Sequence, residues 1–277
     1  MKPTFYLDTN VYDYLVDVDR KAASLLCELV DMNKCRVLGS VELLEEIAGA
    51  ASKGIETQGR YRLFWSIVGW DVLDYAFRIF EAELRKGSQL SIREACLPKP
   101  FIAESRNFST VTAFLKSVHE EIREEKVRYR DHARTFREDF DGKLVDAAEK
   151  TGLDLQTGRK GMRHASIDES VAEEWFQRWF AKRIGSSRKS SLRNLPCARA
   201  WVSIQVARMY RRHSNQPSTD KQGDLFDNSH YMLSAFAGTL VTEDGKFKTT
   251  VDKIDWRPIT VIDAAEFCAR IQSMATE

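Results

Sequence analysis

Short β-prone segments occur near both ends of this 277-residue chain, and helical patterns follow them. Two lie near the N-terminus, at Thr4–Leu7 and Arg36–Gly39, and two lie near the C-terminus, around Leu240 and at Ile259–Ile262. Strands that alternate with helices favour a parallel sheet, because each crossover between parallel strands needs a long connection. The sequence therefore predicts an α/β fold whose parallel sheet is built from both chain ends.

Between these ends the apolar residues recur at helical spacing, and we predict no strand there. We expect residues 1–58 and 214–277 to form the α/β core, and residues 59–213 to form a large all-α insertion that packs partly on it. Helical patterns in the insertion run over Gly59–Lys86, Ser109–Lys150 and Leu195–His213. Four aromatic residues at helical spacing are expected in its core: Trp175, Phe176, Trp179 and Phe180.

The composition is typical of a soluble globular protein, with 43% hydrophobic and 30% charged residues. The net charge of +1 favours no class of partner. Five cysteines without a CxxC pair fit reduced thiols better than a disulfide framework. The chain has no apolar run of about 18 residues and no apolar leader before Thr4. We expect a cytoplasmic protein without a membrane partner.

Acidic side chains follow the strands at both ends of the chain. Asp8 ends the first strand, and Asp244 comes just after the strand around Leu240. Glu46 lies in the helix after the second strand, which Ser40 is expected to cap. Open α/β sheets place their sites outside the carboxyl ends of the strands. We therefore expect these carboxylates to converge.

A further pair of acids, Asp224 and Asp227, opens the helix that precedes the strand around Leu240. Residues three apart lie on the same face of a helix. Asp224 is either the N-cap of this helix or a ligand, and both interpretations stay open. Glu42 and Glu45 are interpreted as solvated helix surface, and His230 as a hydrogen-bonded core or rim histidine.

Clustered carboxylates stay ionised in a pocket only when cations offset their charge. Mg²⁺ and Mn²⁺ prefer oxygen ligands, and such ions activate water for phosphodiester hydrolysis. The chain has no GxSxG motif, P-loop or GxGxxG motif, so neither a serine nucleophile nor a glycine-rich nucleotide cradle is indicated. A phosphatase of the haloacid-dehalogenase type would need a second aspartate where Asn10 stands. The pattern favours metal-dependent hydrolysis.

Three segments resemble successive signatures of the PIN-domain nucleases: FYLDTNVYDYL, LGSVELLEEIAGA and GDLFDNSHYMLSAFAGTLVTEDGKF. They cover about the first 55 and the last 60 residues, so the chain is similar to a larger PIN-like variant with a helical insertion. The resemblance implies a Rossmann-like parallel sheet and a ribonuclease site that depends on Mg²⁺ or Mn²⁺ and acts on single-stranded RNA.

The same resemblance implies roles for individual residues. It makes Asp8, Glu46, Asp227 and Asp244 the catalytic, metal-binding acids, with Asp224 as a further metal ligand. It gives accessory roles to four polar residues, Thr9, Asn10, His230 and Thr242. Thr9 or Asn10 is also expected to cap the helix that begins near Val11.

The stretch from Trp175 to Thr219 contains no Asp or Glu and ten Lys or Arg residues. Phosphate contacts provide affinity for nucleic acid without sequence choice, so a polyanion is one interpretation. The other is a basic surface that offsets acidic neighbours such as Glu120–Glu125. We predict nucleic-acid contacts, with RNA favoured over DNA, at four of the basic residues: Arg183, Arg188, Lys189 and Arg193.

Two functions remain as hypotheses. The first is a metal-dependent endoribonuclease that hydrolyses single-stranded RNA. The second is a catalytically inactive PIN-like module that binds RNA or a protein partner. An antitoxin-like protein or a second copy of the chain is a further candidate partner.

Overall fold

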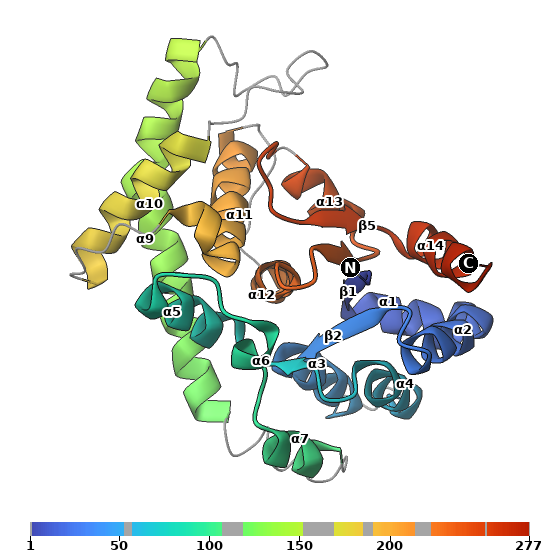
Figure 1. Ribbon diagram of the computed structural model, residues 1–277. Helices are drawn as coiled ribbons and strands as arrows, with labels where there is room; N and C mark the ends of the chain where they lie inside the picture. The colour runs from blue at the N-terminus through green and yellow to red at the C-terminus, as the bar shows by residue number, and fades with distance from the viewer. Residues whose placement is uncertain are drawn as a thin grey trace.

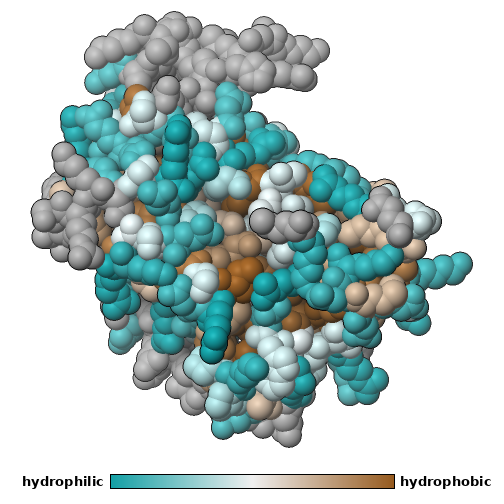
Figure 2. Space-filling view, viewed as in Figure 1, coloured by the Kyte–Doolittle hydropathy of each residue, from teal (hydrophilic) through white to brown (hydrophobic). Residues whose placement is uncertain are grey.

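The computed structural model describes residues 2–52, 57–106, 119–151, 169–184, 191–213, 223–252 and 254–276. Within these ranges, a sheet of five parallel strands lies between two groups of helices, and a further set of long helices extends from one side (Figure 1). The face seen in Figure 2 is mostly hydrophilic on its outer parts, and apolar side chains gather toward its middle. The parallel strands and the helices around them confirm the α/β prediction.

The strands of the sheet lie in the order β3-β2-β1-β4-β5, and every neighbouring pair is parallel. Tyr6 in the central strand is paired with Leu38 on one side and Leu240 on the other. Strands on one side of β1 follow it directly in sequence, whereas those on the other side come from the C-terminal end. The order therefore reverses between β1 and β4. The strands are β1 (Thr4–Leu7), β2 (Arg36–Ser40), β3 (Val72–Leu73), β4 (Thr239–Val241) and β5 (Thr260–Ile262).

Helices pack on both faces of this sheet (Figure 1). On one face α2 contacts both α4 and α14, and on the other α11 contacts both α12 and α13. α12 also packs on β1 and β4, which places it over the point where the strand order reverses. The bounds are α1 (Thr9–Asp13), α2 (Arg20–Asp31), α3 (Val41–Ser52), α4 (Gln58–Val68), α11 (Pro196–His213), α12 (Gly223–Ser234), α13 (Gly245–Val251) and α14 (Ala264–Thr276), with a π-helical turn at Tyr14–Val18.

The remaining helices are joined by buried aromatic rings. The ring of Trp201 on α11 lies 5.1 Å from Phe136, 5.2 Å from Trp179 and 5.3 Å from Phe80, measured between centroids. These rings come from four helices, so one aromatic cluster holds them together. The four aromatic residues expected in the core, Trp175 to Phe180, are buried as predicted. The helices are α5 (Ala76–Lys86), α6 (Ile92–Ala95), α7 (Lys99–Ser105), α9 (His119–Thr151) and α10 (Glu169–Ile184), with a 3-10 turn at Leu192–Asn194.

The prediction of one continuous helix over Gly59–Lys86 is wrong. The chain leaves α4 at Gly69, whose φ of +62° suits a residue without a side chain. Val72 and Leu73 then pair with β2, and the Arg36 guanidinium donates two hydrogen bonds of 2.6 Å to the Asp71 carboxylate beside this strand. The middle of the chain thus supplies an edge strand and is not all-α. The domain boundaries at residues 58 and 213 stay a prediction.

The cap of the first helix also differs from expectation. Asp8, rather than Thr9 or Asn10, is the N-cap of α1, because its Oδ1 accepts from the Thr9 backbone N–H at 2.7 Å. Ser40 caps α3 as predicted, through a 3.2 Å hydrogen bond from the Leu43 N–H. Within the described ranges, no helix is long and apolar enough to cross a bilayer.

Candidate functional site

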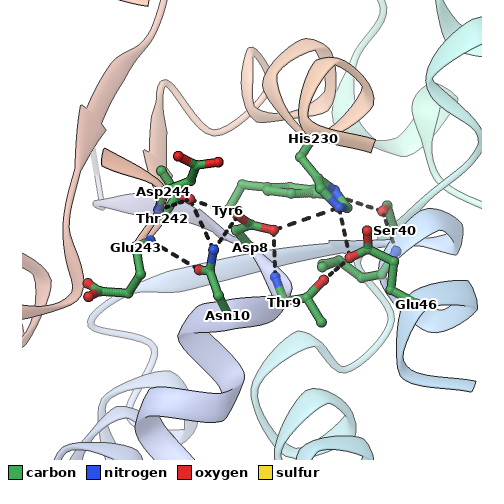
Figure 3. Close-up of polar contacts among 11 residues, drawn as sticks. Tyr6, Asp8, Thr9, Asn10, Ser40, Glu46, His230, Thr242, Glu243 and Asp244 are labelled. Atoms are coloured by element: carbon green, nitrogen blue, oxygen red, sulfur yellow. Dashed lines mark hydrogen bonds and ion pairs between the residues drawn. The ribbon is translucent and has the colours of Figure 1, made fainter. Parts of the chain in front are cut away.

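The Asp8 carboxylate lies at the carboxyl end of β1 and accepts hydrogen bonds on both oxygens (Figure 3). Oδ1 accepts from the Thr9 N–H, and Oδ2 accepts from the Thr242 hydroxyl at 2.7 Å and from the Asn10 amide at 3.0 Å. The side chain is 13% exposed. Because hydrogen bonds to the ionised form hold it in place, Asp8 is a fixed carboxylate that still reaches the surface.

Thr242 and Asn10 join the ends of β1 and β4. The Thr242 hydroxyl accepts from the Asp244 N–H at 3.1 Å while it donates to Asp8. The Asn10 side chain accepts from the Glu243 N–H at 3.1 Å through its oxygen. Both residues therefore tie the loop after β4 to the start of α1, and this fixes the edge of the sheet where the strand order reverses.

Glu46 reaches the same edge from α3. Its Oε2 accepts from the Thr9 hydroxyl and lies 3.1 Å from His230 Nε2. The same imidazole nitrogen lies 3.8 Å from Asp8 Oδ1. One oxygen from Asp8, one oxygen from Glu46 and one nitrogen from His230 all lie within 4.8 Å of one another. Two carboxylates and one imidazole, from the residue after β1, from α3 and from α12, thus form one cluster.

Two linked hydroxyl groups position His230 through Nδ1, the ring nitrogen that does not face the carboxylates. Its Nδ1 lies 2.8 Å from the Tyr6 hydroxyl, which in turn lies 2.6 Å from Ser40 Oγ. Tyr6 and Ser40 are fully buried, and His230 is 2% exposed. The imidazole therefore has one nitrogen fixed by the sheet and the other directed at the carboxylates, as Figure 3 shows.

Burial and the charges of the cluster shift the pKa values of His230 and Tyr6. Burial alone would lower the pKa of His230, but the Glu46 carboxylate, by its charge and its hydrogen bond, and Asp8 together raise it to about 9. Burial raises the pKa of Tyr6 well above its ordinary value, and the nearby Glu42 carboxylate adds to the effect. Without a cation, the cluster thus carries a positive imidazolium between two carboxylates at neutral pH.

Glu42 is buried, and its interpretation as solvated surface is wrong. Its Oε1 accepts from the Ala76 N–H at 2.7 Å, so this carboxylate holds the beginning of α5. Burial raises its pKa to about 7. A glutamate two positions into an amphipathic helix gives no local signal of this role, because the partner lies on an element 34 residues away.

Asp244 lies at the same edge but outside the three-residue cluster. Its Oδ1 accepts from the Lys246 and Phe247 N–H groups at 2.8 and 2.9 Å, so it is the N-cap of α13. In Figure 3, Asp8 lies between Asp244 and Thr242 on one side and His230 and Glu46 on the other. Asp244 is linked to Asp8 only through Thr242 among the contacts of the described residues.

Several predicted site residues lie outside the described residues. Asp224 and Asp227 belong to the first turns of α12, and Arg183 belongs to the end of α10, but the structure does not describe their side chains. Arg188 and Lys189 lie entirely outside the described residues. Arg193 is described: its side chain is exposed, and its Nε pairs with Glu169 Oε2 at 3.2 Å.

The donors of the cluster fit a divalent cation. Carboxylate oxygens suit Mg²⁺ and Mn²⁺, and an imidazole nitrogen suits first-row transition ions. Sequence reasoning did not identify Tyr6, because a tyrosine inside a β-prone segment is typical of a core. Ser40 was expected only as a helix cap. His230 was expected as a hydrogen-bonded core or rim histidine with an accessory role, and it is buried and hydrogen-bonded.

Comparisons of the chain with models of protein families, with curated proteins and with solved structures found no match. The function is therefore inferred from the geometry of the site.

Proposed function

We propose that this chain is a metal-dependent nuclease of the PIN-like type that hydrolyses phosphodiester bonds. The observation that carries the proposal is the convergence of Asp8, Glu46 and His230 at the carboxyl edge of the sheet, within 4.8 Å of one another. They lie where the strand order reverses, and open α/β sheets bind their ligands at such a point. The order β3-β2-β1-β4-β5 also matches the doubly wound Rossmann arrangement, which supports the Rossmann-like part of the proposal.

Asp8 and Glu46 would hold an Mg²⁺ or Mn²⁺ ion, and Asp224, Asp227 and Asp244 are proposed to complete the acidic set. When bound, such an ion supplies an activated water and offsets the charge that develops on the phosphoryl oxygens. Thr242 and Asn10 keep the Asp8 carboxylate in one orientation, and the Thr9 hydroxyl does the same for Glu46. The chain's own contribution is therefore a set of carboxylates positioned before any ligand arrives.

We propose single-stranded RNA as the substrate. The support is the acid-free stretch from Trp175 to Thr219, whose positive side chains would attract phosphates. Arg193 is exposed on this stretch, although Glu169 offsets part of its charge. Arg183, Arg188 and Lys189 are proposed contacts of the same strand. We also propose a protein partner, either an antitoxin-like protein or a second copy of the chain. It would cover the carboxyl edge of the sheet, where the acidic residues lie.

The test is the variant Asp8→Asn, assayed for Mn²⁺-dependent cleavage of a single-stranded RNA. An asparagine keeps an oxygen that can accept from the Thr9 N–H, so the cap of α1 and the fold are expected to survive. The matched control is Asp131→Asn, which changes an exposed aspartate of α9 that pairs with Arg134. We expect cleavage to be lost in the first variant and retained in the second, with cooperative thermal unfolding showing that both proteins are folded. Undiminished cleavage by Asp8→Asn would refute the assignment.

The alternative, a catalytically inactive module, gives a different result in the same experiment. Wild type would then bind the RNA without cutting it, and Asp8→Asn would bind it equally well. Filter binding in EDTA, followed by the cleavage assay in Mn²⁺, separates the two functions.

A further inference from the structure

The imidazole of His230 gives the cluster a nitrogen donor that a purely acidic site lacks. Its Nε2 lies 3.1 Å from Glu46 Oε2 and 3.8 Å from Asp8 Oδ1, so it faces the same space as both carboxylates. The side chain is buried, with a relative exposure of only 2%. A histidine packed this deeply cannot turn its ring away, and Nε2 is presented to whatever the carboxylates bind.

The hydroxyl groups of Tyr6 and Ser40 can accommodate either tautomer of the neutral imidazole. Tyr6 and Ser40 hydroxyls both donate and accept, so the chain can be ordered in two directions. In one, Ser40 donates to Tyr6, Tyr6 donates to Nδ1, and Nε2–H donates to Glu46. In the other, Nδ1–H donates to Tyr6 and Tyr6 donates to Ser40, which leaves the Nε2 lone pair free. The imidazolium of the cluster already has the Nδ1–H of the second arrangement. Only its Nε2 proton has to leave to solvent when a cation binds, and Nε2 then becomes a ligand.

We propose that His230 Nε2 is the third protein ligand of the metal centre, with Asp8 and Glu46, and that it makes the site select a first-row transition ion over Mg²⁺. Tyr6 and Ser40 are positioning residues, because they orient the ring and fix the hydrogen on Nδ1. Ligating histidines commonly have the other ring nitrogen held in this way. Imidazole ligands suit transition ions, whereas Mg²⁺ prefers oxygen and water. The inference rests on the proposed metal centre and adds the identity of its ion.

The test measures binding of Co²⁺, Mn²⁺ and Mg²⁺ by calorimetry, with the visible absorption of Co²⁺ as a second readout. His230→Gln places an amide near the position of Nε2, so it keeps a polar group but removes the nitrogen ligand. We expect wild type to bind Co²⁺ and Mn²⁺ more tightly than Mg²⁺. His230→Gln should lower the Co²⁺ affinity roughly ten-fold or more and change the Mg²⁺ affinity much less.

Tyr6→Phe tests the positioning role without touching the ligands. Its loss of the contact to Nδ1 should lower the Co²⁺ affinity about ten-fold, in the range found for the outer partners of metal ligands. The matched control is Tyr12→Phe. Tyr12 is also fully buried, and within the described residues its hydroxyl has no hydrogen-bond partner, so Co²⁺ binding should not change.

Different outcomes separate this inference from the proposed function. If Asp8→Asn abolishes cation binding but His230→Gln keeps the wild-type ratio of Co²⁺ to Mg²⁺ affinity, the nitrogen ligand is refuted and the metal centre of the proposed nuclease stands. If His230→Gln does not fold, the Co²⁺ spectrum of wild type takes its place, and a weak spectrum like that of Co²⁺ with oxygen ligands alone refutes the nitrogen ligand. An unchanged Co²⁺ affinity in Tyr6→Phe refutes the positioning role. If wild type binds no divalent cation, the imidazolium is the permanent partner of the carboxylates and both proposals fail.

Discussion

The Thr242 hydroxyl donates to Asp8 Oδ2 across 2.7 Å, and this hydrogen bond joins two parts of the chain that are 234 residues apart. It connects the carboxyl end of β4 with that of β1, where the strand order reverses. The same hydroxyl accepts from the Asp244 N–H, so it also positions the turn that leads into α13. Thr242 is buried, and water cannot replace these contacts without a rearrangement.

Thr242→Val should therefore weaken both the fold and the site. Valine keeps the shape but removes the donor to Asp8 and the acceptor for Asp244, at a cost of about 1–3 kcal/mol in the free energy of unfolding. If the proposed nuclease is correct, RNA cleavage should fall at least about ten-fold, because the Asp8 carboxylate loses its orientation. Urea denaturation and initial cleavage rates measure the two effects.

The control for this variant is Thr249→Val on α13. Thr249 is exposed, and its hydroxyl donates only to the Gly245 carbonyl of its own helix among the contacts of the described residues. We expect a change below about 0.5 kcal/mol and wild-type cleavage. Equal losses in the two variants would show that Thr242 has no special role at the site.

A buried carboxylate far from the cluster predicts a pH dependence of stability. Glu83 on α5 accepts from the Cys197 and Ala198 N–H groups at 3.0 and 3.2 Å, at the beginning of α11. Within the described residues its other oxygen has no hydrogen-bond partner. Burial raises its pKa from 4.5 to about 7, against the two N–H groups, which lower it. The titratable group beside it is the buried Cys197 thiol, whose own pKa burial raises.

A raised folded pKa means that the folded state binds the proton more tightly than the unfolded state. The stabilising contribution of Glu83 is then complete below pH 4.5 and is lost as the pH rises through about 7, at about 3 kcal/mol in all. Glu42 has a pKa raised in the same way and should contribute a similar slope. Glu83→Gln should thus remove about a third of the fall in unfolding free energy between pH 5 and pH 8, because the raised pKa values of Glu42 and His230 produce the rest. A slope that stays at the wild-type value would contradict this origin.

Local patterns were sufficient to predict much of the core. The strand at Thr4–Leu7 has the predicted bounds, and α3 begins after Ser40 as expected. Both depend on runs of apolar residues and on a capping side chain, which are properties of neighbours in sequence. Asp8 and Glu46 were expected near the carboxyl edge of the sheet because each has a fixed place relative to a strand end, whereas the choice of Glu46 among the acids of its helix came from the resemblance.

Contacts over long sequence separations could not be predicted in this way. β3 has two residues and is a strand only because β2 pairs with it, while a helical pattern runs through the same region. The contact between Tyr6 and His230 joins residues 224 apart, and nothing near either residue indicates the other. Asp244 was assigned as a ligand through the resemblance, although the contacts by which it caps α13 lie within three residues of it.

Cation binding should raise the stability of the folded protein if the metal centre is correct. A ligand that binds only the folded state at 100 times its dissociation constant contributes about 2.7 kcal/mol. We expect Mn²⁺ to raise the thermal unfolding temperature of wild type and of the surface variant Asp131→Asn. Asp8→Asn lacks one ligand charge and should show little or no rise. A rise of equal size in all three proteins would place the binding somewhere else.

Gly39 in β2 allows the close approach of α4 to the sheet. A Cβ at this position would lie 2.6 Å from Cε2 and Cζ of Phe64 and 2.8 Å from Cγ1 of Val68, and Phe64 is fully buried. Gly39→Ala should therefore force the ring of Phe64 and the strand apart and lower the unfolding free energy by about 1–3 kcal/mol. Because Gly39 precedes Ser40, a shift of the strand would also disturb the hydroxyl chain to His230.

Gly49→Ala is the matched control for this substitution. Gly49 lies in α3, and a Cβ there meets nothing within 4 Å outside its own helix backbone. Alanine in a helix interior is favoured over glycine by about 0.8–1.0 kcal/mol, so this variant should be more stable than wild type. Urea denaturation of the two variants gives opposite signs if the packing of α4 against Gly39 is as tight as the distances imply. A neutral or stabilising effect of Gly39→Ala would show that α4 can move away from the sheet at little cost.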